Sequence, residues 1–484
     1  MTTAQPGTAP IVVSSKRAWQ AMAVLLAGMF MSLLDTTIVN VALPTIRTSL
    51  DANESTLSWI ISGYALAFGL VLIPAGRIGD RFGHKWVFFA GLAIFTAASL
   101  ACGLAQDSTQ LIIARVIQGL GGGIFFPPVQ AFIQLMFPPM KRGKAFGIMG
   151  AVIGISSALG PVVGGLLIQG IGEDTGWRWI FAVNLPIGVI ALIAAVVLLP
   201  KGAEGKKLST DGVGLVLLSA ALIALLVPLI QGQDEGWPLW TYISLGGAVV
   251  LFVLFAFWER RLAARGIEPL VPPHLFSHAA FTGGTILALV YFAAFTSIFF
   301  TISLLWQAGL GHTALESGLV SIPFAIGSIV GASQSDRLAQ KLGRNVLVIG
   351  VGLVTIGLVT LFLELLLIPT ADLTNWILLP ALLVAGIGSG FFIAPNARFI
   401  VATVDRKEAG AASGVIGTMQ RVGSAVGIAV IGSVFFGNVG KIAGPSDLPV
   451  AFGSAATPAL LVSSIFAFVA FLLVFTLPKR VNLH

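Results

Sequence analysis

The sequence predicts an all-α integral membrane protein. Of its 484 residues, 56% are apolar and only 10% are charged, whereas soluble domains are about 25% charged. Apolar runs recur along the chain, and each is about as long as a bilayer span requires, roughly 20 residues. Because a segment in lipid must satisfy its own backbone hydrogen bonds, each run is expected to be a helix.

Fourteen such spans are expected. The first begins near Trp19, and no small-residue cleavage site follows it, which favours a retained span over a signal peptide. The spans are placed near residues 19–42, 57–76, 86–105, 110–135, 144–170, 179–199, 212–231, 240–258, 280–304, 314–334, 345–367, 374–397, 408–436 and 456–477.

Basic residues are unevenly distributed between the connections. The two termini and the connections on their side of the membrane hold nearly all Lys and Arg, whereas the opposite connections hold only Arg47, Arg178 and Lys441. By the positive-inside rule, both termini are expected in the cytoplasm. The net charge of +7 is therefore explained by topology and does not indicate nucleic-acid binding.

The chain contains an internal repeat. "GRIGDRFGHK" (76–85) follows the second span and matches "ASQSDRLAQK" (332–341) after the tenth, so that Asp80-Arg81 aligns with Asp336-Arg337. Repeated halves are typical of secondary transporters. The repeat predicts an N-terminal six-helix bundle (1–200), two inserted helices with flanking linkers (201–265) and a C-terminal six-helix bundle (266–484).

These motifs resemble those of one family. "LDTTIVNVALP", "GRIGDRFGHK", "ARVIQGLGGG" and "GISSALGPVVGG" occur in order on the expected helices, and "WRWIFAVNLPIG" and "LLWQAGLGHTALESGLVSIP" are also typical. Together they resemble the fourteen-span drug:proton antiporter branch of the major facilitator superfamily. The resemblance implies the major facilitator fold, export driven by protons, and a monomer.

Asp35 and Arg115 are the leading candidates for proton coupling or cation binding. Asp35 lies within an apolar span, where burial favours the protonated form of an acid, and intramembrane acids are functional by default. The alternative is a structural aspartate bonded to Thr36 or Thr37. Arg115 is expected at a similar depth, where it would pair with Asp35; the alternative is that it reaches the membrane surface. The resemblance implies a role for both residues in proton transfer.

The repeated loop is expected to form a gate at the cytoplasmic side. Asp80 would accept hydrogen bonds from a helix N-terminus in the other half, where the helix dipole favours an anion, while glycines permit a tight turn and basic side chains pair with acids or lipid headgroups. The gate residues are Gly76, Arg77, Asp80, Arg81, Gly83, Lys85, Asp336 and Arg337.

Small residues in the fifth span form a second motif. Small side chains allow helices to approach closely, and proline removes a backbone donor. The residues are Gly154, Gly160, Pro161, Gly164 and Gly165. The resemblance implies an antiporter motif that seals the bundle interface in one state, which favours export over uptake; a plain packing helix is the alternative.

The remaining candidates carry weaker signals. Arg421 lies near the middle of its span and must find a partner, water or a cavity, and Glu364 lies near the end of its span and is a second proton or cation candidate. Aromatic and amide side chains that suit flat lipophilic cations would line the cavity: Trp59, Tyr64, Gln118, Phe125, Phe126, Gln130, Phe292, Phe295, Trp306 and Gln307.

The sequence predicts a transporter and not an enzyme. It has no Walker pattern, so a proton gradient is the expected energy source without any cofactor, and His274 and His278 lack the further ligands of a metal site. The prediction is a bacterial inner-membrane exporter of amphipathic, mostly cationic drugs, in contact with membrane lipids and protons. Three alternatives stay open: a narrow exporter of one antibiotic, metabolite or lipid, a non-transporting sensor, and an uptake symporter.

Overall fold

The computed structural model describes residues 14–52, 54–172, 175–200, 211–232, 235–402, 404–405, 408–439 and 448–479. The predicted linker at 201–210 and Lys441 lie outside these ranges. Within them, fourteen helical spans are long and apolar enough to cross a membrane. The predicted fold class and number of spans are therefore confirmed.

Most helices are longer than the predicted spans, those at 212–231 and 345–367 coincide with them, and two spans are broken. Val183 separates α6 from α7, and Ser321 separates α11 from α12. The helices are α1 (Ser15–Ser49), α2 (Glu54–Phe82), α3 (His84–Leu104), α4 (Ser108–Met136), α5 (Pro139–Ile171), α6 (Gly176–Ala182), α7 (Asn184–Leu198), α8 (Gly212–Gln231), α9 (Leu239–Ala264), α10 (Ala279–Leu304), α11 (Ala314–Val320), α12 (Ile322–Leu342), α13 (Asn345–Leu367), α14 (Asn375–Val401), α15 (Ala409–Val439) and α16 (Leu448–Val474), with short helical turns at η1 (Pro273–Ser277), η2 (Leu305–Gly309) and η3 (Thr370–Asp372).

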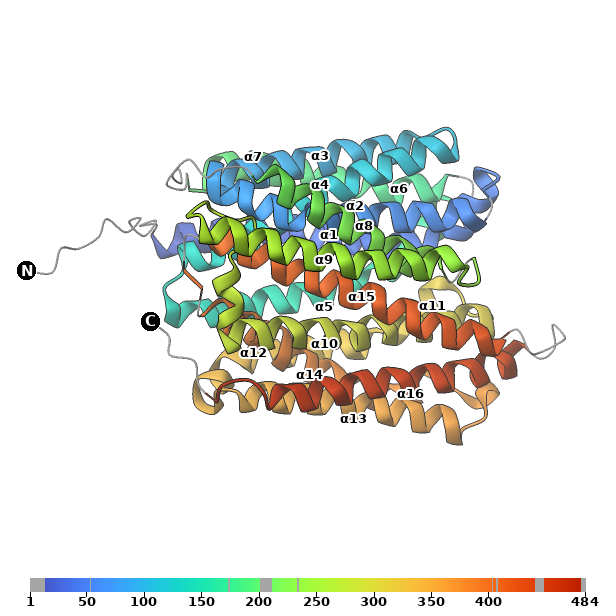
Figure 1. The fold of residues 1–484 in the computed structure, drawn as a ribbon. Coiled ribbons are helices and arrows are strands. Elements are labelled where there is room, and N and C mark those ends of the chain that lie inside the picture. The colour runs from blue at the N-terminus through green and yellow to red at the C-terminus, as the bar shows by residue number, and fades with distance from the viewer. Residues whose placement is uncertain are drawn as a thin grey trace, which may run out of the picture.

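The helices form two bundles with an inserted pair between them. Helices α1 to α7 form the N-terminal bundle and α10 to α16 the C-terminal bundle (Figure 1). The inserted helices α8 and α9 pack on each other, and α8 also contacts α2 and α15. The two bundles meet where α2 packs on α15 and where α5 packs on α11, α12 and α14.

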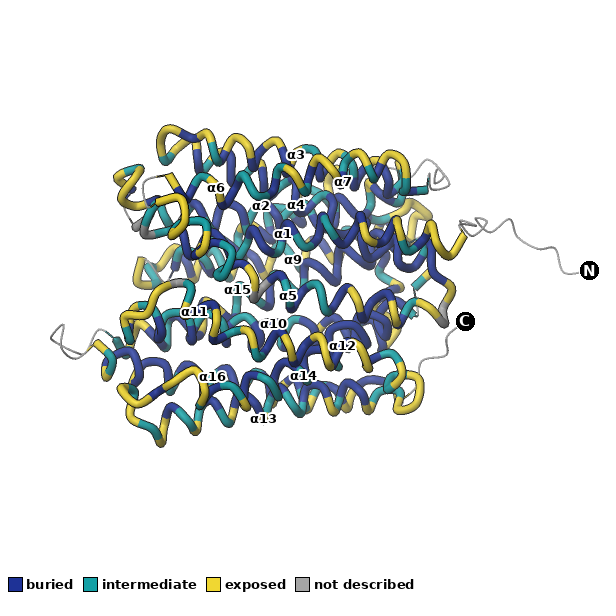
Figure 2. The backbone as a smooth tube through the Cα atoms, turned by 180° about the vertical axis from the view of Figure 1, so that it is seen from behind, coloured by how far each residue is buried: buried dark blue, intermediate teal, exposed yellow. Residues whose placement is uncertain are grey.

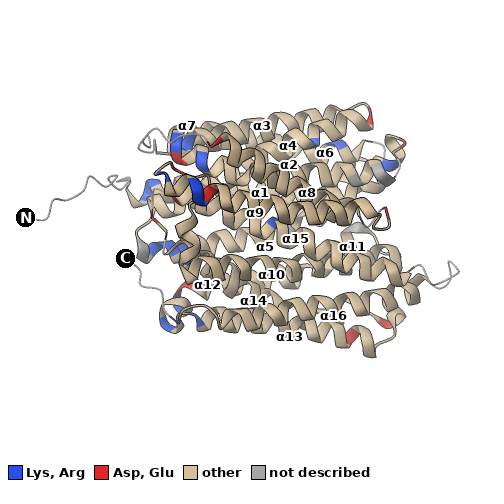
Figure 3. Cartoon of the chain, viewed as in Figure 1, with Lys and Arg blue, Asp and Glu red and all other residues tan. Residues whose placement is uncertain are grey.

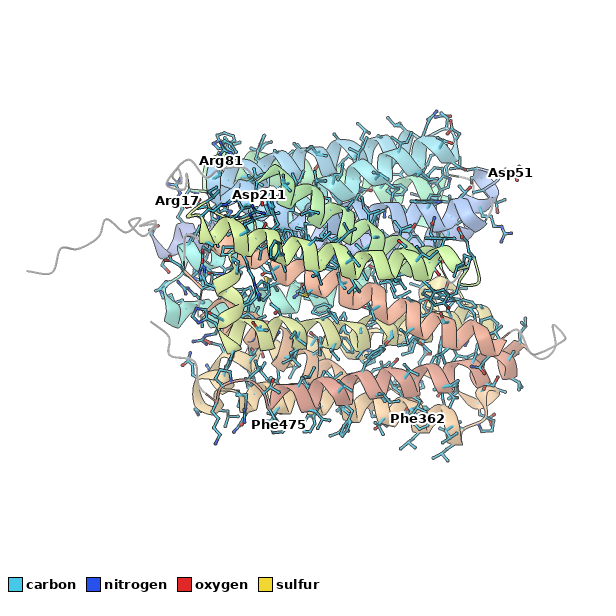
Figure 4. All side chains as sticks on the ribbon, in the orientation of Figure 1. Arg17, Asp51, Arg81, Asp211, Phe362 and Phe475 are labelled. Carbon is cyan, nitrogen blue, oxygen red and sulfur yellow. The ribbon has the colours of Figure 1, made fainter. Side chains whose placement is uncertain are left out.

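Both termini lie at one end of this assembly, which we call the terminal end (Figure 1). Most Lys and Arg residues gather at that end (Figure 3). Figure 4 labels Arg17, Arg81 and Asp211 there and Asp51 at the opposite end. Charged side chains thus lie at the two ends, and the middle of the assembly is nearly free of them.

Burial follows the pattern expected of a protein surrounded by lipid. Buried backbone runs along the helix faces that pack inside the assembly, and exposed positions lie on the outer faces and at the ends (Figure 2). Large apolar side chains are exposed on the outer helices, including Ile190, Ile243 and Phe257. Such a surface would be unfavourable in water, and it suits the hydrocarbon core of a bilayer.

Candidate functional site

Asp35 lies in a closed polar network inside the N-terminal bundle. Its Oδ2 accepts a hydrogen bond from Arg115 Nη1 at 2.6 Å, and its Oδ1 accepts from Gln118 Nε2 at 2.9 Å and from Asn184 Nδ2 at 3.0 Å. Asp35 is 0% and Arg115 1% exposed. Helices α1, α4 and α7 therefore together hold one fully buried, charge-assisted cluster.

The same network reaches α2 and α3. Gln118 Nε2 also donates to Ser99 Oγ at 2.6 Å, and Arg115 Nε donates to the carbonyl oxygen of Ile60 at 3.1 Å. The Arg115 guanidinium lies 4.2 Å from the centre of the Tyr64 ring, and the Tyr64 hydroxyl lies 3.0 Å from Ser32 Oγ. Five helices thus fix the ion pair, and few of its hydrogen-bonding groups are left without a partner.

This geometry distinguishes between the two hypotheses for the contacts of Asp35 and of Arg115. Arg115 does not reach the membrane surface but pairs with Asp35, as expected from their similar depths. Thr36 and Thr37 do not bond Asp35, since their hydroxyls donate to backbone carbonyls of Ser32 and Leu34. The pairing is a structural observation; a role of the pair in proton transfer stays a prediction.

Sequence reasoning missed Asn184 and Ser99. Asn184 is the first residue of α7, directly after the break that interrupts the sixth span. It is completely buried, and its Oδ1 has no hydrogen-bond partner among the described residues. An amide beside a helix break in "AVNLP" was a usable signal, whereas Ser99 in the apolar third span carried none.

The predicted cavity residues do not form one group. Tyr64 and Gln118 belong to the Asp35 network. Phe125 packs edge-on against Phe88 and Phe95 in the core of the N-terminal bundle, which corrects its assignment to the cavity. Trp306 is also corrected, because it is buried and its Nε1 donates to Asn375 Oδ1 at 2.8 Å.

The other cavity candidates are dispersed. Phe126 packs on Phe68, with ring centres 5.5 Å apart, and Gln130 is buried with its Oε1 unpaired among the described residues. Phe292 and Phe295 lie in an aromatic cluster of the C-terminal bundle. Gln307 donates to Ser303 and Ser317, and Trp59 lines a small recess between α2 and α8 together with Ser62, Leu66, Val227, Ile230 and Gln231.

Asp80 joins the two bundles at the terminal end. It accepts hydrogen bonds from the backbone N–H groups of Gly410 at 2.9 Å and Ala411 at 3.0 Å, at the start of α15. His84 Nε2 lies 3.3 Å from the same carboxylate. An anion at a helix N-terminus is stabilised by the free N–H groups and the helix dipole. The contact expected of the gate is present.

The basic residues of this loop make contacts that the expected pairing with acids or lipid headgroups did not include. Arg77 donates to the carbonyl oxygen of Pro269, and Lys85 donates to the carbonyls of Val196 and Leu199. The Arg81 guanidinium lies over the Phe82 ring. Lys85 is thus bound at the C-terminal end of α7, where the helix dipole attracts cations, whereas Arg77 binds a carbonyl in the connection after α9.

Two of the loop's glycines have separate functions. Gly83 precedes α3 with a φ of +91°, which favours glycine. Gly76 lies within α2 and not in the turn, and a Cβ at this position would overlap the carbonyl oxygen of Gly410. Gly76 therefore permits α2 and α15 to touch.

The repeat forms a second contact with a different partner. Asp336 Oδ1 accepts from Arg398 Nη1 at 2.7 Å, and a Cβ at Gly143 near the start of α5 would overlap the same carboxylate. The adjacent gate candidate Arg337 has no hydrogen bond or ion pair in the part of the chain that the structure describes. The charged partner is instead Arg398, near the end of α14.

Arg398→Gln is expected to loosen the terminal end. The pair lies within the C-terminal bundle and holds the Asp336 carboxylate against Gly143 of α5. A charge-assisted hydrogen bond contributes about 1.5–3 kcal/mol, so its loss is expected to favour local opening at this contact by about tenfold or more. Hydrogen exchange of backbone amides at the start of α5, near Asp336, measures the opening. Arg337→Gln is the matched control and should leave exchange unchanged; equal exchange in both variants would refute the role of Arg398.

The small residues of α5 lie at helix contacts on the other side of the interface. A Cβ at Gly160 would overlap Thr37 of α1, and one at Gly164 would lie 2.9 Å from Ile38. Gly165 faces Leu315, and Pro161 faces Gly318, both in α11. Gly154 faces Ser328 of α12. The motif thus packs α5 both within its own bundle and against the other.

The weaker candidates lie apart. Glu364 is half-buried on α13 with its Oε2 unpaired among the described residues. Arg421 lies on α15 with its guanidinium 4.0 Å from the centre of the Phe68 ring on α2. Neither residue reaches the Asp35 network by a hydrogen bond.

The fold and the two inter-bundle contacts define a transporter of the major facilitator type. The family model described as "Major Facilitator Superfamily" matches residues 25–428 and 284–483. The chain belongs to the major facilitator superfamily. This agrees with the motifs of the drug-exporting branch.

Curated relatives are antibiotic export and resistance proteins. A "Probable actinorhodin transporter" of Streptomyces coelicolor is 38% identical over 90% of this chain and 75% of its own length. The "Tetracenomycin C resistance and export protein" of Streptomyces glaucescens is 33% identical over 88% and 77%. The "Cephamycin export protein CmcT" of Amycolatopsis lactamdurans is 32% identical over 91% and 90%.

Solved structures share the fold at low sequence identity. The proton:xylose symporter XylE has a TM-score of 0.65 with 14% identity, and 95% of each chain is covered. The human organic anion transporter MFSD10 has a TM-score of 0.65 with 15% identity, covering 94% of this chain and 99% of its own. At these identities the likeness concerns architecture alone.

Proposed function

We propose that this protein is a proton-coupled exporter of amphipathic aromatic compounds that works by alternating access. It resides in the bacterial cytoplasmic membrane as a monomer, surrounded by lipid, with the terminal end in the cytoplasm. The positive-inside distribution of Lys and Arg supports this orientation.

The observation that carries the proposal is the buried Asp35–Arg115 pair. Protonation of Asp35 removes the negative charge that holds Arg115, Gln118 and Asn184 in place. The cluster spans helices α1, α4 and α7, so this change of charge bears directly on how the helices pack. A proton that binds here can therefore bias the bundle between two arrangements.

The contacts between the bundles supply the two states. Asp80 with α15 closes the terminal end, together with the Asp336 carboxylate, which Arg398 of the same bundle holds against Gly143 of α5. The small residues of α5 pack against α11 nearer the opposite end. In alternating access the two sets of contacts break and form in turn, as the bundles rock about a central site. Proton binding at Asp35 would set their relative stability.

The relatives support export of an antibiotic-like substrate. Each is named for one compound or class of compound, which favours a narrow exporter as the second candidate. The sequence also favours cationic drugs, on the basis of Asp35 and the aromatic residues. However, Arg115 already neutralises Asp35 inside the N-terminal bundle, so this acid contributes no free charge to the interface.

Substrate-driven proton movement tests the proposal. In proteoliposomes with an imposed proton gradient, addition of a transported aromatic compound is expected to release protons in proportion to its flux. Rhodamine 123 and fluorescein serve as probes of opposite charge on one ring system. Flux without proton movement would contradict coupling; absence of flux for both, and for a panel of neutral antibiotics, would favour a sensor.

A further inference from the structure

Arg421 lies at the contact between the two bundles, deep in the assembly. One face of α15 follows α2: Gly410 lies beside Gly76, Gly414 beside Ile73 and Gly417 beside Leu72. Arg421 is the next position on that face, and its guanidinium stacks on Phe68 at 4.0 Å. Arg421 is several turns from either end of α15 (Ala409–Val439), and the terminal end holds most of the other basic residues (Figure 3). The side chain thus bridges the surface along which the bundles separate.

No acid among the described residues pairs with Arg421. The helices that pack most closely on α15 are α2, α4, α8, α10, α14 and α16. Of these, only α2 contains Asp or Glu, and its Glu54 and Asp80 lie at its two ends. Within the described ranges Arg421 makes no hydrogen bond or ion pair. The interface therefore carries one positive charge in its interior without a counter-charge.

Arg421 differs from Arg115, another arginine inside the assembly, in its partners and in its exposure. Arg115 is also a charged residue inside a membrane span, but it donates hydrogen bonds to the Asp35 carboxylate, the Gln118 amide oxygen and the carbonyl oxygen of Ile60. A buried charge without such partners is costly, and in membrane helices it marks a substrate or ion pathway. Arg421 is also only half-buried, whereas Arg115 is 1% exposed.

The surroundings of Arg421 are aromatic. Phe68 is fixed against α4, where a Cβ at Gly122 would lie 2.9 Å from its ring, and it packs edge-on against Phe126 at 5.5 Å. The Tyr64 ring lies 6.0 Å from that of Phe68 and directly beneath Arg115. A flat ring system that replaced Phe68 over the guanidinium would meet several ring faces.

We propose that Arg421 binds the anionic group of the exported compound, so that the preferred substrates are aromatic acids or acidic phenols and not cations. The proposal rests on the export function above and names its substrate class. A guanidinium recognises a carboxylate through two parallel hydrogen bonds. Phe68, Phe126 and Tyr64 supply the apolar surface for the rings once the bundles part.

The substrate's charge also determines the electrical character of export. Exchange of one proton for one monovalent cation moves no net charge, whereas exchange of one proton for one monovalent anion moves two positive charges inward. An inside-negative membrane potential drives the second process and not the first. Export of acidic compounds should therefore accelerate with potential.

Equilibrium binding to the purified full-length protein tests the site without requiring transport. Fluorescein is expected to bind more tightly than rhodamine 123, measured by fluorescence anisotropy. Arg421→Gln should weaken fluorescein binding by about tenfold or more, because a charge-assisted contact is lost. Arg421→Lys should retain most of it, and Arg421→Glu should reverse the preference between the dyes. Gln420→Ala, which leaves the charge in place, is the matched control.

Two results of the binding measurement would overturn the assignment. These are tighter binding of rhodamine 123 by the wild type, and unchanged fluorescein affinity in Arg421→Gln with normal thermal stability. Failure of the export function is distinguishable, since it would abolish proton-coupled flux while the Arg421-dependent binding persisted. Rhodamine 123 flux with proton release and without fluorescein binding would leave export intact and refute the anion site.

Discussion

Asp35→Asn is expected to abolish substrate-driven proton exchange and to destabilise the folded protein. The amide cannot take up a proton at the relevant pH, and it leaves Arg115 buried without a counter-charge. Removal of one partner of a buried ion pair costs about 3–5 kcal/mol. Proton release in proteoliposomes and thermal unfolding of the purified variant measure the two effects.

A double variant separates the two effects of that change. Asp35→Asn combined with Arg115→Gln removes both charges, so much of the lost stability is expected to return, since replacement of a buried pair by neutral groups is often nearly neutral. Proton exchange should stay absent. If the double variant exchanged protons with substrate, Asp35 would be structural and Glu364, whose Oε2 is buried without a partner among the described residues, would be the next candidate.

The Asp35 network shows which contacts of the site can be predicted from the sequence. Depth along a span follows from counting residues, so the pairing of Asp35 with Arg115 was predictable. The contribution of Ser99 was not, because it depends on the rotation of α3. Asn184 carried a signal in "AVNLP", but its place in the network depends on the break before α7. Periodicity does not specify rotation when a helix is apolar on all sides.

The second contact at the terminal end shows the same limit. The repeat identified Asp336, since "SDR" copies the "GDR" of the first loop, but it named no partner for the carboxylate. The actual partner, Arg398, is 62 residues further along and reaches Asp336 only through the packing of α12 on α14. Likewise, Phe125 and Trp306 were misassigned because aromatic residues look alike in sequence whether they face a core or an interface.

Gly76→Ala is expected to prevent full closure of the terminal end. The added methyl group would overlap the carbonyl oxygen of Gly410, which is a backbone atom and cannot move without displacing α15. Displacement of α15 also pulls the N–H groups of Gly410 and Ala411 away from Asp80. Because both losses fall on the closed state alone, flux is expected to drop by more than about tenfold, equivalent to about 1.4 kcal/mol.

Hydrogen exchange at the start of α15 should rise in Gly76→Ala, since its first N–H groups lose their acceptor. Gly170→Ala is the matched control, because nothing lies within 4 Å of a Cβ at that position of α5. Normal flux in Gly76→Ala would show that the tight α2–α15 contact is dispensable. If flux falls while fluorescein still binds through Arg421, closure and substrate recognition are separate properties of α15. Its first turn then closes the interface, and its middle binds the substrate.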